Sequence, residues 1–258
     1  PGATTPLKLD IQLKDVGYKA GEGFSGTGTT TLLDDCDFNF NSVTLKIKKA
    51  GTQASVEVKN GDLEKLNGQI AFESNVKVQG QDIKIEGSVA GEYKKGVGIG
   101  GRAEAKVKET TAPIPLGSIG TLVIFNDTQL SAEVKENKFD NLKFNLHAEY
   151  ARTAEPAIVV DIRASVDYKE GEGFSGEAAA EVKSENVKLI EIPGGYTLFL
   201  QKGTGAIVKL AKNELVHVGG TINLMLKDAE GDFIKASVTA DYKVKENQFS
   251  GNGSAEVV

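Results

Sequence analysis

The chain has 258 residues with 30 basic and 36 acidic side chains, which gives a net charge of −6. This mildly acidic, interleaved charge excludes the basic stripe that a nucleic-acid partner requires. The longest apolar runs are too short for a membrane helix, and Cys36, as the single cysteine, excludes an internal disulfide. We therefore predict neither a nucleic-acid partner nor a transmembrane segment.

A repeat of about 75 residues runs through the chain. Matching segments begin at Tyr18, Tyr93, Tyr168 and Tyr242, and a second landmark recurs at Leu63, Phe139 and Leu215. Self-similarity at a fixed period is typical of repeat architectures. We predict one continuous array over residues 1–258, with approximate repeats at 1–62, 63–138, 139–214 and 215–258. Because the array begins and ends within a repeat, we expect the sequence to be part of a longer chain.

In chain order, each repeat begins with an alternating strand that ends at the tyrosine. A glycine-rich turn follows, and at 21–26 and 171–176 it fits G-x-G-x-x-G. A dinucleotide loop would need a helix next, but alternation continues there, so we interpret the motif as a β-turn. The second strand carries small residues on one face, as at 174–182, which predicts close approach of a neighbouring backbone or bulky side chain.

A less regular segment follows at 34–50, 109–127 and 184–204, and because it varies between repeats we predict that any partner binds there. A hairpin then closes each repeat. Its turn is predicted at Asn60-Gly61, and at the equivalent pairs 136–137 and 212–213, where asparagine tolerates positive φ.

These elements predict an all-β fold: an antiparallel meander of long strands in about three and a half tandem repeats of about 75 residues. Repeats stacked side by side would share one continuous core. The pattern is compatible with a barrel, a sandwich or an open array.

Candidate site residues are few. Asp34, Asp35 and Asp37 form the densest oxygen cluster, a possible calcium site, although a solvated turn is the favoured interpretation. His147 and His217 lie in strand-like segments, and with one distant cysteine they fall short of a zinc site or a catalytic triad. We predict no catalytic residue, no cofactor and no enzymatic activity.

The Tyr-Lys-x-Gly-x-Gly-Phe-Ser-Gly segment and the small-residue strand after it resemble the β-repeat regions of large exported bacterial proteins. Polymorphic toxins, cargo proteins of contractile injection systems and giant adhesins carry such regions. The resemblance implies a secreted or cell-surface scaffold whose partner is the rest of its own chain or a toxin.

Two alternatives to a scaffold remain open. The first is a binding module, either an adhesin or a groove for apolar ligands such as lipid. The apolar faces at 83–85 and 222–226 are candidates for such a groove, which would be similar to that of bridge-like lipid-transfer proteins. The second is a hydrolase with paired carboxylates.

Overall fold

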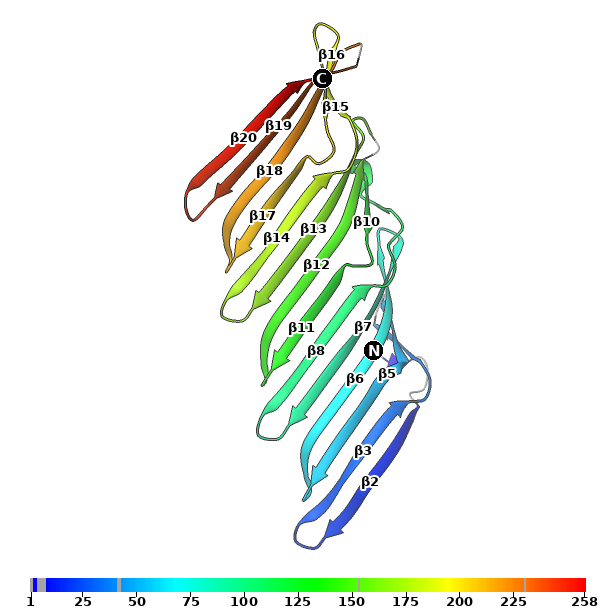
Figure 1. Cartoon of the computed structure of the whole chain (residues 1–258). Helices are drawn as coiled ribbons and strands as arrows, with labels where there is room; N and C mark the ends of the chain where they lie inside the picture. The colour runs from blue at the N-terminus through cyan, green and yellow to red at the C-terminus, as the bar shows by residue number, and fades with distance from the viewer. Residues whose placement is uncertain (1, 4–7, 41–42, 153, 230) are drawn as a thin grey trace. The chain divides into compact units, whose positions relative to one another are not determined.

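The computed structural model describes residues 2–3, 8–40, 43–152, 154–229 and 231–258. Strands make up 76% of the chain and helix 1%, so the predicted all-β class and antiparallel meander are confirmed (Figure 1). By its internal contacts the chain divides into two compact units. Unit 1 comprises Pro1–Glu109 and Gln129–Lys143, and unit 2 comprises Thr110–Thr128 and Phe144–Val258.

Unit 1 is an antiparallel sheet in which the long strands follow one another in the order β2, β3, β5, β6, β7, β8 and β11. The short strand β4 pairs with the first part of β5, and β1 pairs with β4. The bounds are β1 Gly2–Ala3, β2 Leu9–Lys19, β3 Gly23–Leu32, β4 Cys36–Phe40, β5 Val43–Lys59, β6 Asp62–Val78, β7 Gln81–Lys94, β8 Gly98–Val107 and β11 Gln129–Lys135.

Unit 2 repeats this plan with β13, β14, β17, β18, β19 and β20 as neighbours. The bounds are β9 Ile114–Pro115, the 3-10 helix η1 Gly117–Ile119, β10 Thr121–Ile124, β13 Ile158–Lys169, β14 Gly173–Val182, β15 Val187–Ile192, β16 Tyr196–Leu200, β17 Gly205–Ala211, β18 Glu214–Lys227, β19 Asp232–Lys243 and β20 Gln248–Val257. Strand β12, Lys138–Arg152, begins in unit 1 and continues in unit 2.

The division into units does not follow the predicted repeat boundaries, which lie one residue into β6, β12 and β18, directly after two-residue turns. The reason is the segment 110–128. Its strand β10 pairs with the later part of β12, from Ala148 to Ala151, and so belongs with unit 2 although it precedes β11 in the sequence.

The closing hairpins have the predicted turns. Both residues of each turn have positive φ: 54° and 79° at Asn60-Gly61, 49° and 65° at Glu136-Asn137, and 52° and 68° at Lys212-Asn213. Two consecutive left-handed residues form the type I′ turn, whose twist matches that of the strands it joins. Asparagine therefore replaces glycine here without loss of the turn.

The G-x-G-x-x-G segments are β-turns, as predicted. They join β2 to β3 and β13 to β14, and a strand rather than a helix follows each. Beside the turns, Tyr18 packs on Phe24 with ring centroids 4.9 Å apart, and Tyr168 packs on Phe174 at 4.8 Å. In these two hairpins the repeated tyrosine thus contacts the aromatic residue on the opposite strand.

Small residues in the second strand of each repeat allow the close backbone approach that the sequence predicts. A Cβ added at Gly176 would lie 2.2 Å from the carbonyl oxygen of Ser165. At the equivalent Gly101 and Gly251 the nearest carbonyl oxygen would be 2.7 Å and 2.9 Å away. These distances leave no room for a side chain.

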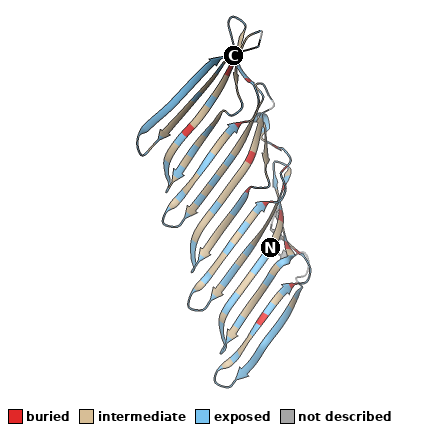
Figure 2. Cartoon of the chain, viewed as in Figure 1, coloured by how far each residue is buried: buried red, intermediate tan, exposed pale blue. Residues whose placement is uncertain are grey.

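The sheet of each unit is open, and most residues of its long strands are intermediate or exposed rather than buried (Figure 2). We call "apolar face" the face that carries Ile70 and Val89 in unit 1, and Ile222 and Val238 in unit 2. These residues form the cross-strand pairs Ile70–Val89 and Ile222–Val238, and they are 45% to 50% exposed. The expected continuous core is therefore wrong: within the described residues, no second layer covers this face.

Burial is concentrated instead at the ends of the long strands. Leu32, Val107 and Val182, which end β3, β8 and β14, are buried, and so are Cys36, Ile114 and Val187 in the segments that follow. The variable segments thus contribute to small cores, and their strands β4, β10 and β16 pair with β5, β12 and β18. Partner binding there stays a prediction, and residues 41–42 lie outside the described part.

No helix in the described residues is long and apolar enough to cross a membrane.

Candidate functional site

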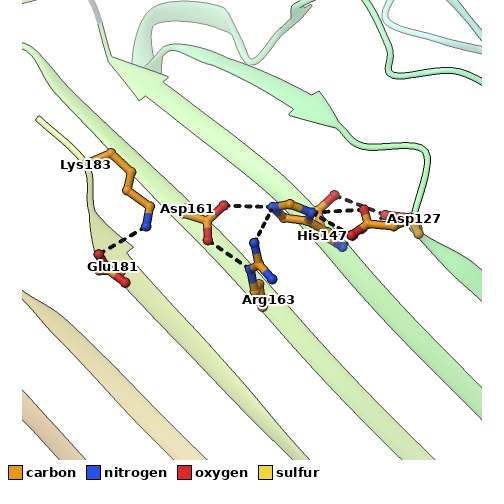
Figure 3. Close-up of polar contacts among 7 residues, drawn as sticks. Asp127, His147, Asp161, Arg163, Glu181 and Lys183 are labelled. Atoms are coloured by element: carbon orange, nitrogen blue, oxygen red, sulfur yellow. Dashed lines mark hydrogen bonds and ion pairs between the residues drawn. The ribbon is translucent and has the colours of Figure 1, made fainter. Parts of the chain in front are cut away.

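A connected polar cluster lies in unit 2 around His147 (Figure 3). We call "His147 cluster" the residues Asp127, His147, Asp161 and Arg163. His147 lies on β12, Asp161 and Arg163 lie on β13, and Asp127 lies in the turn after β10. Because Asp161 and Arg163 are two residues apart on one strand, both side chains lie on the same face of the sheet.

His147 is held between two carboxylates. Its Nδ1 lies 2.9 Å from both carboxylate oxygens of Asp127, and its Nε2 lies 2.9 Å from Oδ1 of Asp161. Nε of Arg163 donates to Oδ2 of Asp161 at 3.1 Å. The ring of Phe125 stacks on the imidazole with centroids 4.2 Å apart. The His147 and Asp161 side chains are 18% and 13% exposed, so the centre of the cluster is shielded from water.

Both ring nitrogens of His147 have polar neighbours. Nδ1 faces the carboxylate of Asp127, whereas Nε2 lies 2.9 Å from Oδ1 of Asp161 and 3.3 Å from Nη2 of Arg163. The carboxylate of Asp161 is thus shared by the imidazole of His147 and the guanidinium of Arg163.

Asp161 is ionised more readily than an ordinary aspartate. Its burial raises its pKa, but the hydrogen bonds from His147 and Arg163 and the nearby positive charges outweigh this. The pKa of Asp161 therefore lies below its usual value of 3.8. The cluster depends on that negative charge, because the carboxylate of Asp161 is shared by the ring of His147 and the guanidinium of Arg163.

We expect this cluster to contribute to acid sensitivity. Since the folded-state pKa of Asp161 is lowered, its stabilisation is fully present above about pH 5 and is lost as the pH falls through the folded value. In urea titrations at successive pH values, Asp161→Asn should lose less stability below about pH 5 than the wild type. Asp127→Asn, whose carboxylate is 60% exposed, is the control and should follow the wild type more closely. An unchanged acid profile in Asp161→Asn would contradict this role.

The His147 cluster is not arranged as a catalytic triad. In a triad one ring nitrogen faces a nucleophile, but here both nitrogens face carboxylates. The neighbouring hydroxyl of Ser165 donates to Oδ1 of Asn145 at 2.7 Å. Thr128 is occupied by the backbone of His147, from whose N–H its Oγ1 accepts at 3.0 Å. The hydrogen bonds of His147 instead link β12 to β13 and to the turn at Asp127.

A threonine hydroxyl that accepts a hydrogen bond from a backbone N–H recurs in three repeats, and it was not predicted from the sequence. We call this contact a threonine corner. Oγ1 of Thr128 donates to the carbonyl of His147, and Oγ1 of Thr204 accepts from the N–H of Asn223 at 2.9 Å. Thr52 accepts from the N–H of Ala71 at 3.1 Å. The three threonines are spaced by 76 residues, so the repeat period could have revealed them.

Two of the three candidate calcium residues, Asp34 and Asp35, form ion pairs with lysines. Asp34 forms an ion pair with Lys8 at 3.2 Å, and Asp35 forms one with Lys48 at 2.8 Å. The hydrogen bond from Lys48 lowers the pKa of Asp35. Within the described ranges, Asp34, Asp35 and Asp37 belong to no group of three or more ligands suited to a metal. The geometry therefore gives the calcium hypothesis no support.

His217 forms a smaller contact of its own. Its Nε2 lies 3.0 Å from Oδ1 of Asp241 on the neighbouring strand β19. Nδ1 is buried and has no hydrogen-bond partner among the described residues. The contact between His217 and Asp241 resembles the contact between His147 and Asp161. Among the described residues, no second carboxylate hydrogen-bonds to His217.

Unit 1 has a hollow of about 790 Å³ over β3 to β11. Its lining includes acids and bases together, such as Glu92, Arg102 and Glu133, with the amides of Asn67 and Gln69. Arg102 forms an ion pair with Glu104 of its own strand. This mixed lining singles out no ligand class.

No protein-family model matches this chain, and no curated protein matches it at a significant level.

Proposed function

We propose that this chain is a non-enzymatic scaffold segment of a large exported bacterial protein, secreted or at the cell surface. Its role would be to carry or enclose another part of its own protein, such as a toxin or effector. The observation that carries the proposal is the open sheet with a large uncovered apolar face in each unit. Exposed apolar surface of this extent is typical of surfaces that contact a partner.

The polar clusters support the scaffold role because their contacts connect strands. The His147 cluster joins β12 to β13, and the threonine corners join the turns to the long strands. Lys209 and Glu177 form a cross-strand ion pair at 2.8 Å between β17 and β14. Paired charges across neighbouring strands stabilise a sheet.

A panel of esterase, phosphatase and glycosidase substrates tests the non-enzymatic part of the proposal. We expect any background turnover of the purified chain to be the same in the wild type and in His147→Ala and Asp161→Asn. Circular dichroism would establish that the variants are folded. Turnover that is lost in a folded His147→Ala variant would contradict the proposal.

A second candidate function, an apolar-ligand surface, is favoured by the chemistry of the same face. Ile222 and Val238 lie opposite each other and are each 50% exposed, beside Gly253 and Ala255 on β20. Aliphatic and small side chains of this kind suit acyl chains better than they suit polar ligands. Native mass spectrometry of the chain separates the two functions: co-purified lipid would favour the ligand surface, and a lipid-free mass would favour the scaffold.

A further inference from the structure

We propose that the outer edge of β20 binds an antiparallel β-hairpin with branched aliphatic residues opposite Gly251 and Gly253 and an asparagine in its turn. Among the described strands, β20 pairs with β19 alone (Figure 1). An edge strand presents unpaired N–H and C=O groups, which a further strand can pair with.

The repeat shows which kind of strand fits this edge. The strands equivalent to β20 each pair on that side with a strand of the closing hairpin: β3 with β5, β8 with β11, and β14 with β17. Each pairing extends over six residues in the same register. For β14 the register runs from Gly176 opposite Leu210 to Glu181 opposite Gly205. Transferred to β20, it places six residues of the incoming strand opposite 251–256.

Side-chain size sets the chemistry of the incoming strand. Opposite the equivalents of Gly251 lie Val58, Val134 and Leu210. In unit 1, a Cβ added at Gly28, the equivalent of Gly253, would lie 3.1 Å from Cγ1 of Val56. The branched side chain of the paired strand thus occupies the space above the glycine. The same space over Gly253 suits a valine or leucine.

The turn of the incoming hairpin is specified by a second contact. The N–H of Ile99 donates to Oδ1 of Asn137 at 2.8 Å, and the N–H of Phe174 donates to Oδ1 of Asn213 at 2.8 Å. In return, the backbone N–H groups of Asn137 and Asn213 donate to the carbonyls of Ile99 and Phe174. Phe249 is the equivalent residue at the start of β20. Its backbone can therefore exchange the same two bonds with an asparagine of the hairpin.

The edge of β20 also lacks the features that usually block strand addition. Proteins guard exposed edges with lysine, proline or bulges. The strand Gln248–Val257 contains neither lysine nor proline, and its pairing with β19 runs without a bulge. Every residue of β20 is exposed. The one charged residue of β20 is Glu256, at its last position but one.

Disulfide trapping tests both the site and its register. The probe is a peptide taken from this chain, from the segment that pairs with β14, the strand equivalent to β20. The probe is the segment Thr204–Asn213, which should place residue 207 directly opposite Ser254. Protein with Ser254→Cys is mixed with the peptide carrying either Ile207→Cys or Val208→Cys under a glutathione redox buffer. Because neighbouring residues point to opposite faces, the Ile207→Cys peptide should crosslink at least about tenfold more than the Val208→Cys peptide.

Protein without the added cysteine is the control, because its native Cys36 is 1% exposed and should not react. Adding Asn213→Ala to the Ile207→Cys peptide should lower the crosslinking several-fold, because it removes the contact to Phe249. Equal yields from the two peptides, no crosslink, or a protein dimer through Ser254→Cys alone would each overturn the proposal. The dimer would show that a second copy takes the edge. Anisotropy of the labelled, cysteine-free peptide with wild-type protein should show saturable binding, and its absence would also overturn the proposal.

Discussion

Gly87→Ala is expected to lower the free energy of unfolding of unit 1 by about 2 kcal/mol, within the range for overpacked sites. A Cβ at Gly87 would lie 2.2 Å from the carbonyl oxygen of Glu104 and 2.7 Å from Cζ of Phe72. The first atom belongs to the paired strand β8 and the second to a ring that covers the glycine. Since the carbonyl cannot move without breaking strand pairing, β7 and β8 must separate locally. Urea denaturation followed by circular dichroism measures the effect.

Gly91→Ala is the matched control because it lies on the same strand and the same face. Its new Cβ would meet only the carbonyl oxygen of Gly100, at 3.9 Å, which is an ordinary contact. An alanine tolerated by the backbone reduces the freedom of the unfolded chain, so we expect a change between zero and a gain of about 1 kcal/mol. Equal destabilisation by the two substitutions would contradict the close approach of β7 and β8 at Gly87.

Thr128→Val is expected to destabilise the protein by about 1–3 kcal/mol, because a buried N–H loses its acceptor. Thr128 is 8% exposed, and its hydroxyl both accepts from the N–H and donates to the carbonyl of His147. Valine keeps the shape and removes both bonds. The loss should appear as a lower midpoint of thermal unfolding and as faster amide exchange around His147.

Thr30→Val is the same substitution, but we expect the opposite effect on stability. The hydroxyl of Thr30 is buried and has no hydrogen-bond partner in the described part of the chain. The equivalent positions in β8, β14 and β20 are Ala105, Ala180 and Ala255, so the site is apolar. Removing an unsatisfied hydroxyl should leave stability unchanged or raise it by about 1 kcal/mol. If both variants lost the same stability, the hydroxyl of Thr128 would have no special role.

The strands and turns of the fold could be predicted because each has a local signal. Alternation predicted β13 and β19, which end one residue after Tyr168 and Tyr242, and consecutive turn residues such as Lys212-Asn213 predicted the hairpins. The same alternation is compatible with a sandwich, a barrel or an open sheet, because in each case one face is apolar. Whether that face is covered depends on the position of distant strands. The open sheet therefore followed from the structure alone.

The His147 cluster could be predicted only in part. Strand parity places Asp161 and Arg163 on one face, but it does not show which residue of β12 lies beside them. Asp127 comes from a turn 20 residues before His147, and no local pattern links the two. The pairing of a large side chain on one strand with a small residue on the next could not be predicted from the sequence either. Phe72 lies opposite Gly87, whereas the equivalent pair in unit 2 is Leu224 opposite Ala236.

Cysteine accessibility on the apolar face tests the central claim that this face is uncovered. Val89→Cys in unit 1 and Val238→Cys in unit 2 replace residues that are 45% and 50% exposed, and native Cys36 is the buried reference. In dilute solution, a maleimide should alkylate both new thiols within about tenfold of the rate at Ser254→Cys on the exposed β20, because thiol reactivity follows exposure. If the new thiols were instead as protected as Cys36, the apolar faces would be covered in solution, and an open sheet with an uncovered apolar face would be wrong.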